Sequence, residues 1–415
     1  MDKRPIRICL LSYRSNPHSG GQGGYIKNLS RALVELGHHV DVVSGPQYPE
    51  LDAGVNLVKL PSLDLYDPEN PFRVPKASEL KDMTNLIEWL GVSTMGFPEP
   101  FTFGLRAARY INQHKKQYDV VHDNQSLSYG IWAIKKQLPT LATIHHPITV
   151  DRRIAVKSAP HLWQKLKELR WHSFLVMQKR VARTLPHIIT VSDCARKDIC
   201  EAFRMDPNRF SIVPNGINTD LFYPIEGIRR EKNRVIVTNS ADTPLKGLNY
   251  LLQAVSEIAK TRDIHLVVVG TPKENGLVVK LIRTLGIGDL VTFTGRISYA
   301  QFVQQYAKAS VAVVPSVYEG FGLPAGEAMA CGVPVISTTG GALPEVVGDA
   351  GILVPPADSN ALARALFSVL DHPEYAQTLS EAGYRRVQNH LTWRAAAKNT
   401  VATYNKIMAG CSDYC

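Results

Sequence analysis

The chain has 415 residues, of which 45% are hydrophobic and 20% charged, and its formal net charge is +10 at pH 7. This length is typical of two α/β domains of roughly 200 residues each, and the composition excludes an intrinsically disordered chain. The positive charge attracts nucleic acid, anionic lipid and phosphorylated small molecules alike, so only the sequence motifs can indicate which of these the protein binds.

Targeting and redox features predict a cytoplasmic protein. The N-terminal apolar run Ile6–Tyr13 is too short for a signal peptide, and no uncharged apolar stretch approaches the roughly 18 residues that span a bilayer. The six cysteines form no CxxC pair, so we expect reduced thiols and no zinc site.

Short β-rich runs alternate with helical patterns in two series. The first series comprises Arg7–Tyr13, Val40–Ser44, Val55–Leu60, Val120–His122, Leu141–His145, Ile188–Ser192 and Phe210–Pro214. The second comprises Arg234–Asn239, His265–Gly270, Val291–Gly295, Val311–Pro315, Val335–Thr338 and Ile352–Pro355. Strands that are apolar on both faces are typical of parallel sheets covered by helices. The sequence therefore predicts an α/β fold with two Rossmann-like, doubly wound domains facing each other across a cleft.

The predicted domain bounds are 1–215 for the first domain and 216–390 for the second, with a C-terminal helix in 391–415 that packs back toward the first. At the boundary, Asn215 and Gly216 suit a hinge turn because both residue types tolerate positive φ. Residues 61–103 contain six prolines and little periodicity. They are either an acceptor-side insertion or a surface excursion with a short helix near Ser78–Leu90.

The most informative run extends from Glu319 to Ile336 and reads EGFGLPAGEAMACGVPVI. Pro324 suits the first turn of a helix, which predicts a loop over Gly320–Leu323 and places Glu327 near the helix N-terminus. Unpaired N–H groups at that terminus favour a phosphate, and carboxylates accept hydrogen bonds from hydroxyls. A nucleotide sugar offers both kinds of group.

This run resembles the signature of family 4 glycosyltransferases of the GT-B fold. The resemblance implies that Glu319 contacts hydroxyls of the transferred sugar and that Glu327 binds the nucleotide ribose. The loop between them, with Gly320, Phe321, Gly322 and Leu323, would also bind the donor. The implied reaction is retaining transfer of a hexose from a nucleoside-diphosphate sugar, UDP favoured over GDP, to a hydroxyl acceptor, without a metal or other cofactor.

A glycine-rich stretch in the first domain is similar to the family's loop that faces the donor diphosphate. It precedes a predicted helix over Tyr25–Leu36, and its glycines are Gly20, Gly21, Gly23 and Gly24. An ordinary packing role for these glycines is the alternative.

Two further residues match functional positions of the family. His145 follows a predicted strand and would contact the acceptor or the sugar as a neutral donor or a cation, with His146 or a purely structural role as alternatives. Lys246 would neutralise the leaving diphosphate, although it could also be a solvated lysine. The family usually has an arginine where this chain has Ala241. Arg296 or Arg14 would have to compensate.

Residues 157–183 contain seven Lys or Arg and only one acidic residue, interleaved with apolar residues such as Trp163 and Leu166. This segment could make peripheral contact with an anionic membrane surface. The alternative is one long helix whose aromatic residues form core.

The partners predicted from the motifs are a nucleotide-sugar donor and a hydroxyl acceptor, which could be a small molecule, a glycan or a lipid-linked sugar. The chain has no nucleic-acid recognition module and no Asp-x-Asp element that would hold a metal ion. A nucleotide-sugar epimerase of the same fold, and a donor-binding partner subunit with weak catalysis, are the alternative functions.

Overall fold

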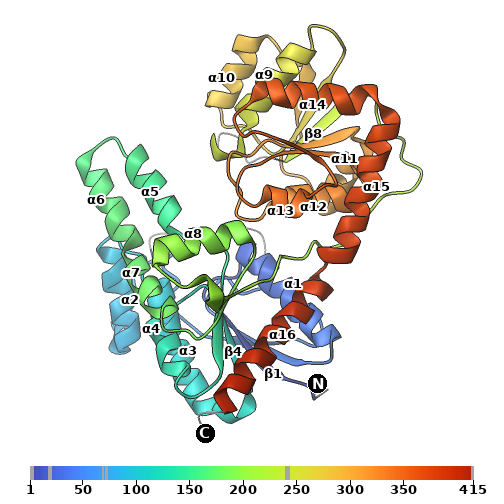
Figure 1. The fold of residues 1–415 in the computed structure, drawn as a ribbon. Helices are drawn as coiled ribbons and strands as arrows, with labels where there is room; N and C mark the ends of the chain where they lie inside the picture. The colour runs from blue at the N-terminus through green and yellow to red at the C-terminus, as the bar shows by residue number, and fades with distance from the viewer. Residues whose placement is uncertain (1–3, 17–20, 68–69, 71–72, 239–243, 413–415) are drawn as a thin grey trace. The chain divides into compact units, whose positions relative to one another are not determined.

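The computed structural model describes residues 4–16, 21–67, 70, 73–238 and 244–412. Contacts divide the chain into two compact units (Figure 1). The first comprises Met1–Val191, Ala195–Val213 and Ala396–Cys415, and the second comprises Ser192–Cys194 and Pro214–Ala395. The short segment Ser192–Cys194 thus belongs to the second unit although it lies within the sequence of the first.

The first unit contains a seven-stranded parallel sheet with the order β3-β2-β1-β4-β5-β6-β7. Its strands are β1 (Arg7–Ser12), β2 (His39–Ser44), β3 (Asn56–Lys59), β4 (Val120–Asn124), β5 (Thr140–Ile144), β6 (Ile188–Thr190) and β7 (Phe210–Ile212). Its helices are α1 (Gly21–Glu35), η1 (Glu79–Lys81), α2 (Met83–Ser93), α3 (Glu99–His114), η2 (Lys115–Gln117), α4 (Tyr129–Ile134), α5 (Thr149–Ser158), α6 (Leu162–Trp171), η3 (His172–Phe174), α7 (Leu175–Ala182), α8 (Asp193–Phe203), η4 (Pro207–Arg209) and α16 (Trp393–Ser412). The first residues of α8 and of α16 belong to the second unit.

The second unit contains a six-stranded parallel sheet with the order β10-β9-β8-β11-β12-β13. Its strands are β8 (Arg234–Thr238), β9 (His265–Val269), β10 (Val291–Phe293), β11 (Val311–Val314), β12 (Val335–Thr338) and β13 (Ile352–Val354). Its helices are η5 (Pro244–Lys246), α9 (Leu248–Ile258), α10 (Leu277–Leu285), η6 (Gly288–Leu290), α11 (Tyr299–Lys308), α12 (Leu323–Ala330), α13 (Leu343–Val347), α14 (Ser359–Asp371) and α15 (Pro373–His390).

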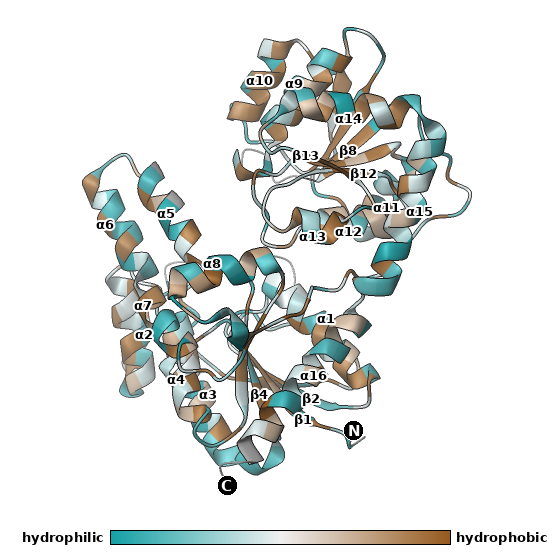
Figure 2. Cartoon of the chain, in the orientation of Figure 1, coloured by the Kyte–Doolittle hydropathy of each residue, from teal (hydrophilic) through white to brown (hydrophobic). Residues whose placement is uncertain are grey.

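The strands form the core of each unit because most of their side chains are apolar, although β4 ends in the buried polar residues His122, Asp123 and Asn124. All residues of β4, β5, β11 and β12 are buried. Figure 2 shows β8 coloured toward the hydrophobic end, whereas the helices around it carry hydrophilic residues as well. Burial on both faces fits parallel strands covered by helices. The predicted fold class, two doubly wound Rossmann-like domains, is confirmed.

Three local predictions are wrong. Helix α1 begins at Gly21 and not at Tyr25, so the described glycines lie in its first turn. Residues 157–183 form parts of α5, α6, η3 and α7 and not one long helix. Gly216 does not have positive φ. A Cβ there would instead lie 2.3 Å from the backbone nitrogen of Trp393, so close backbone approach explains the glycine.

The structure also answers the predictions for the proline-rich segment and for membrane-spanning helices. The segment 61–103 contains η1, α2 and the first turns of α3, with its helix at Met83–Ser93 close to the predicted position. Of the helices in the described ranges, none combines the length and the apolar character that crossing a bilayer would take.

Candidate functional site

The order of strands reverses between β8 and β11 in the second sheet, since β9 lies on one side of this pair and β12 on the other. Ligands of open α/β sheets bind outside the carboxyl ends of the strands at such a switch point. The chain that leaves β11 carries Glu319, and the chain that follows β8 carries Lys246. The topology therefore brings these two predicted site residues to one edge of the sheet.

Lys246 and Glu319 form an ion pair in which Nζ lies 2.5 Å from Oε1. The side chains are 33% and 13% exposed, so the pair is partly accessible to solvent. Ser316 Oγ also donates a hydrogen bond of 2.9 Å to Glu319 Oε1. Sequence reasoning assigned separate ligand groups to the lysine and the glutamate and did not predict their contact.

Backbone contacts hold the two chain segments together. The amide of Val317 donates to the carbonyl of Leu245 at 2.8 Å. Gly247 has φ +68°, and a Cβ there would lie 1.9 Å from the carbonyl oxygen of Pro315. Only glycine combines this backbone conformation with such a close approach. Gly247 therefore permits the contact that positions Lys246 beside Glu319.

A glycine pair after β12 holds the other side of Glu319. The amide of Ala342 donates to the Glu319 carbonyl at 2.9 Å. Gly341 has φ +67°, and a Cβ there would lie 2.1 Å from the same carbonyl oxygen. Ser316, Gly247 and Gly341 were missed by sequence reasoning. The signal available was the Thr339-Gly340-Gly341 run directly after a predicted strand.

Helix α12 carries the second glutamate. Gly322 is its N-cap with φ 105°, and the helix begins at Leu323, so Leu323 belongs to the helix and not to the predicted loop. Gly320 remains in the loop, and Phe321 is buried. Glu327 is the fifth helical residue and keeps some exposure, but burial raises the pKa of its carboxyl from 4.5 to about 7. A neutral carboxyl can donate one hydrogen bond, and an ionised one only accepts.

The candidates for replacing the family arginine differ in their surroundings. Ala241 lies outside the described residues. Arg296 is exposed and follows the edge strand β10, which β9 separates from β8. Arg14, in the first unit, is not a free cation, because its guanidinium pairs with Glu99 at 3.0 Å.

The glycines of the first unit have unequal roles. Gly20 lies outside the described residues. Gly21 and Gly24 are exposed in the first turn of α1, and a Cβ at either would meet no atom within 4 Å. At Gly23 a Cβ would lie 2.4 Å from the carbonyl oxygen of Asn16, so this glycine has a packing reason. The first turn of a helix exposes unpaired N–H groups that suit an anion.

His145 follows β5 and is fixed by its neighbours. Its Nε2 lies 2.9 Å from Asn124 Oδ1, its amide donates to Gln125 Oε1 at 2.8 Å, and its ring meets Tyr25 edge-on with centroids 4.6 Å apart. Burial, with a smaller contribution from His146, lowers the pKa of His145 to about 3. The ring is therefore neutral at pH 7 and not a cation.

The neighbouring histidine is in a different environment. His146 Nε2 lies 3.0 Å from Asp151 Oδ2, and both side chains are about half exposed. Of the two, His145 is the one held in a defined orientation by buried neighbours. In the described parts of the chain, no group of three or more His, Cys, Asp or Glu residues could hold a metal ion.

Two family models match the chain. The model described as "Glycosyltransferase Family 4" matches residues 19–221, and "Glycosyl transferases group 1" matches residues 224–386. Together they account for most of both units.

Comparison with curated proteins finds full-length relatives. The chain is 48% identical to an MMP alpha-(1->4)-mannosyltransferase of Mycolicibacterium hassiacum, a match that covers 97% of this chain and 99% of that protein. It is 28% identical to D-inositol 3-phosphate glycosyltransferase 2 of Catenulispora acidiphila, with 98% and 96% coverage.

Solved structures share the fold over nearly the whole chain. A sucrose-phosphate synthase from Thermosynechococcus elongatus aligns with a TM-score of 0.70 at 26% identity, covering 97% of this chain and 99% of that chain. Anabaena Alr3699/HepE in complex with UDP and glucose aligns with a TM-score of 0.66 at 16% identity, covering 96% and 99%, which shows the fold alone. With both family models matched and a relative of nearly half-identical sequence along its whole length, the chain belongs to the family 4 glycosyltransferases of the GT-B fold.

Proposed function

We propose that this glycosyltransferase transfers a hexose from a nucleoside-diphosphate sugar to a hydroxyl of a saccharide acceptor, with retention of anomeric configuration. The observation that carries the proposal is the Lys246–Glu319 pair at the switch point of the second sheet. A cation there can stabilise charge on a leaving diphosphate, and a carboxylate beside it can orient the sugar.

Each group of the nucleotide-sugar donor has a proposed partner in the second unit. Glu319 accepts hydrogen bonds from hydroxyls of the transferred sugar, and Glu327 binds the ribose. The diphosphate lies near Lys246 and the N-terminus of α12, where unpaired N–H groups favour an anion. Lys246 then exchanges part of its contact with Glu319 for contact with phosphate oxygens, which leaves Ser316 to hold the carboxylate.

Mannose is the hexose to test first, because the relative at 48% identity is named as a mannosyltransferase. For the nucleotide we keep UDP as the expectation, with GDP and ADP as the competitors. We also propose that transfer needs no metal ion, since Lys246 and helix N-termini supply the positive potential that the diphosphate requires. Rates that stay within 2-fold after treatment with EDTA would agree with this, and restoration of a lost rate by Mg²⁺ or Mn²⁺ would contradict it.

The test of the donor site is a panel of UDP-, GDP- and ADP-sugars, assayed for thermal stabilisation and for slow donor hydrolysis. Stabilisation by no member of the panel would refute the proposal. In the same assay Glu327→Ala should weaken binding of free nucleotide and nucleotide sugar alike. Glu319→Ala should instead reduce turnover and sugar discrimination and spare the free nucleotide.

Lys246→Ala should lower kcat by about 10²- to 10³-fold, the range seen when one group that stabilises developing charge is removed. Lys260→Ala is the matched control, since Lys260 forms an exposed ion pair with Glu257 in the same unit. Equal activity of the two variants would exclude Lys246 from the diphosphate site.

We further propose a cytoplasmic protein that touches anionic membranes through α6. Cys9 and Cys331 are buried free thiols, which suits a reducing compartment. Leu162, Trp163 and Leu166 of α6 are 74%, 61% and 58% exposed, and Lys165 and Lys167 lie on either side of Leu166 in sequence. In Figure 1, α5 and α6 extend side by side away from the sheet of their unit. Apolar and basic residues on one short helix favour a headgroup surface.

Co-sedimentation with vesicles that contain phosphatidylglycerol, at moderate salt, tests the membrane contact. Binding should fall when Trp163 and Leu166 are both changed to Ser. Equal binding by the unchanged protein to neutral and anionic vesicles, or no binding to either, would remove the membrane proposal and leave the transferase proposal untouched.

A further inference from the structure

A small cavity lies in the first unit at the carboxyl ends of three neighbouring strands. It has a volume of about 20 Å³, and its polar lining includes Arg14, Gln47, Asp64, Glu88, Glu99 and Arg106. Arg14 follows β1, Gln47 follows β2 and Asp64 follows β3, so the cavity occupies the edge of the sheet where ligands of this fold class bind. This volume holds one water molecule or one hydroxyl-sized group.

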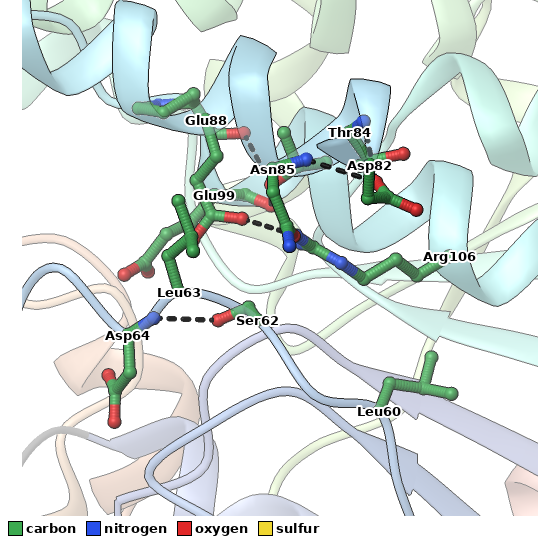
Figure 3. A network of polar contacts seen from close by, with 12 residues as sticks. Leu60, Ser62, Leu63, Asp64, Asp82, Thr84, Asn85, Glu88, Glu99 and Arg106 are labelled. Atoms are coloured by element: carbon green, nitrogen blue, oxygen red, sulfur yellow. Dashed lines mark hydrogen bonds and ion pairs between the residues drawn. The ribbon is translucent and has the colours of Figure 1, made fainter. Parts of the chain in front are cut away.

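The segment 61–103 builds one wall of this cavity. Figure 3 shows Ser62 and Asp64 on the chain after β3, with Glu88 on α2 and Glu99 nearby. Glu99 is the first residue of α3. The segment that interrupts the sequence pattern thus contributes carboxylates to a cavity at the sheet edge, which favours the acceptor-side interpretation over a surface excursion.

Glu99 has one oxygen that is satisfied and one that is not. Oε1 accepts a hydrogen bond of 3.0 Å from Arg14. Oε2 is buried and accepts no hydrogen bond from any residue that the structure describes. Burial raises the pKa of this carboxyl from 4.5 to about 7. A buried acceptor without a donor is costly, so a bound donor at Oε2 would be stabilised.

Both arginines of the cavity are already engaged. Arg14 lies 5.5 Å from the ring centroids of Tyr66 and Phe97 in addition to its pair with Glu99. Arg106 pairs with Glu88 at 2.6 Å, and these side chains are only 11% and 2% exposed.

Neither arginine is therefore available to pair with a phosphate without breaking a contact. The cavity contains three acidic residues, Asp64, Glu88 and Glu99, against these two arginines. A phosphate would add negative charge beside the acids, whereas a hydroxyl would donate to Glu99 without such repulsion.

We propose that this cavity is an acceptor subsite in which Glu99 Oε2 binds a hydroxyl of a neutral sugar, and that it selects against a phosphorylated acceptor. The inference rests on the proposed transferase function and adds the chemical class of the acceptor. A preference for a neutral acceptor would distinguish this chain from the relatives named D-inositol 3-phosphate glycosyltransferases.

The experiment compares Glu99→Gln with the unchanged protein, using the nucleotide mannose that the donor panel identifies. The acceptor probes are methyl α-mannoside and its 6-phosphate. The unchanged protein should prefer the neutral acceptor by at least about 10-fold in kcat/KM. Glu99→Gln should raise the KM for the neutral acceptor by about 10-fold or more, because the amide places either a donor NH2 group or a weaker acceptor oxygen where Oε2 accepts from the hydroxyl. Donor hydrolysis without acceptor should stay within 2-fold.

The matched control is Glu79→Gln, on the same segment but outside this cavity, where Glu79 pairs with Arg73. A folded Glu99→Gln protein with an unchanged KM for the acceptor would overturn the inference. The cavity would then hold only a structural water at Oε2. If that variant does not fold, Asp64→Asn tests the inference instead, because it removes one negative charge from the cavity. This variant should fold, since Asn also tolerates the positive φ of 47° at this position. It should raise kcat/KM for the 6-phosphate, and no rise would overturn the inference.

Failure of the proposed function would be recognised separately. In that case the unchanged protein would neither hydrolyse any donor nor transfer to either acceptor.

Discussion

At the scale of single residues, the cation and the carboxylate of the proposed donor site are paired with each other. Lys246 and Glu319 are in contact at 2.5 Å, with Ser316 as a third partner. A partly exposed ion pair adds little stability, because solvent screens it and both side chains lose freedom. The pair is therefore better explained by what it positions than by the stability it adds. In the proposed donor complex, sugar hydroxyls would take the place of Lys246 at Glu319, and phosphate oxygens the place of Glu319 at Lys246, so neither charge would lack a partner.

Glu327 should make the stability of the protein depend on pH. Its pKa is about 7 in the folded protein against an ordinary value of 4.5. Its favourable contribution is therefore fully present below about pH 4.5 and is lost as the pH rises through 7. Glu327→Gln should remove this dependence.

The measurement is chemical denaturation of the unchanged protein and of Glu327→Gln between pH 5 and pH 8. As the pH rises, the unfolding free energy of the unchanged protein should fall relative to that of Glu327→Gln, by an amount on the order of a few kcal/mol. Gln253→Ala, on the surface of α9, is the control and should show a constant difference, because this substitution removes no titratable group. A constant difference for Glu327→Gln as well would contradict the raised pKa.

At the scale of elements, glycines decide how the loops after β8, β11 and β12 approach one another. Gly247, Gly322 and Gly341 all have positive φ, and a Cβ at each would meet an atom closer than 3.0 Å. The strands themselves need no such residues, because hydrophobic runs suffice to place them in the sheet. The site therefore depends on loop contacts that run between elements distant in sequence.

Gly247→Ala should cost more stability than Gly286→Ala. Both glycines have nearly the same φ, +68° and +65°, but a Cβ at Gly286 would meet no atom within 4 Å. Gly286→Ala thus measures the cost of the left-handed conformation alone, about 1 kcal/mol. Gly247→Ala adds the collision with Pro315, for which we expect about 1–3 kcal/mol more. Thermal or chemical denaturation gives the difference, and donor hydrolysis should fall only in Gly247→Ala.

At the scale of the whole molecule, the chain returns to the first unit after it completes the second. Residues from Ala396 onward in α16 belong to the first unit. Tyr404 of α16 is fully buried and its hydroxyl lies 2.7 Å from His122 Nδ1. His122 Nε2 lies 2.7 Å from Thr143 Oγ1, so this helix is tied to the centre of the first sheet.

Tyr404→Phe should destabilise the protein by about 1–3 kcal/mol, because it leaves one nitrogen of a buried histidine without a partner. Tyr375→Phe is the control, since Tyr375 is 44% exposed and should change stability by less than about 0.5 kcal/mol. Chemical denaturation followed by circular dichroism measures both. Equal effects of the two substitutions would show that the buried hydrogen bond is unimportant.

The sequence alone determined the strands, the two-sheet architecture and the family, because these depend on local periodicity and on one long continuous motif. It also singled out Glu319, Glu327 and Lys246, although the roles of these residues remain predictions. Only the tertiary structure decided that Lys246 and Glu319 touch, that Gly247 and Gly341 hold the loops around them, and that His145 is neutral. It also brought Arg14 and Glu99 together at one cavity, 85 residues apart in the chain. Contacts of this kind depend on burial and on the close approach of distant backbone segments, and neither leaves a local pattern in the sequence.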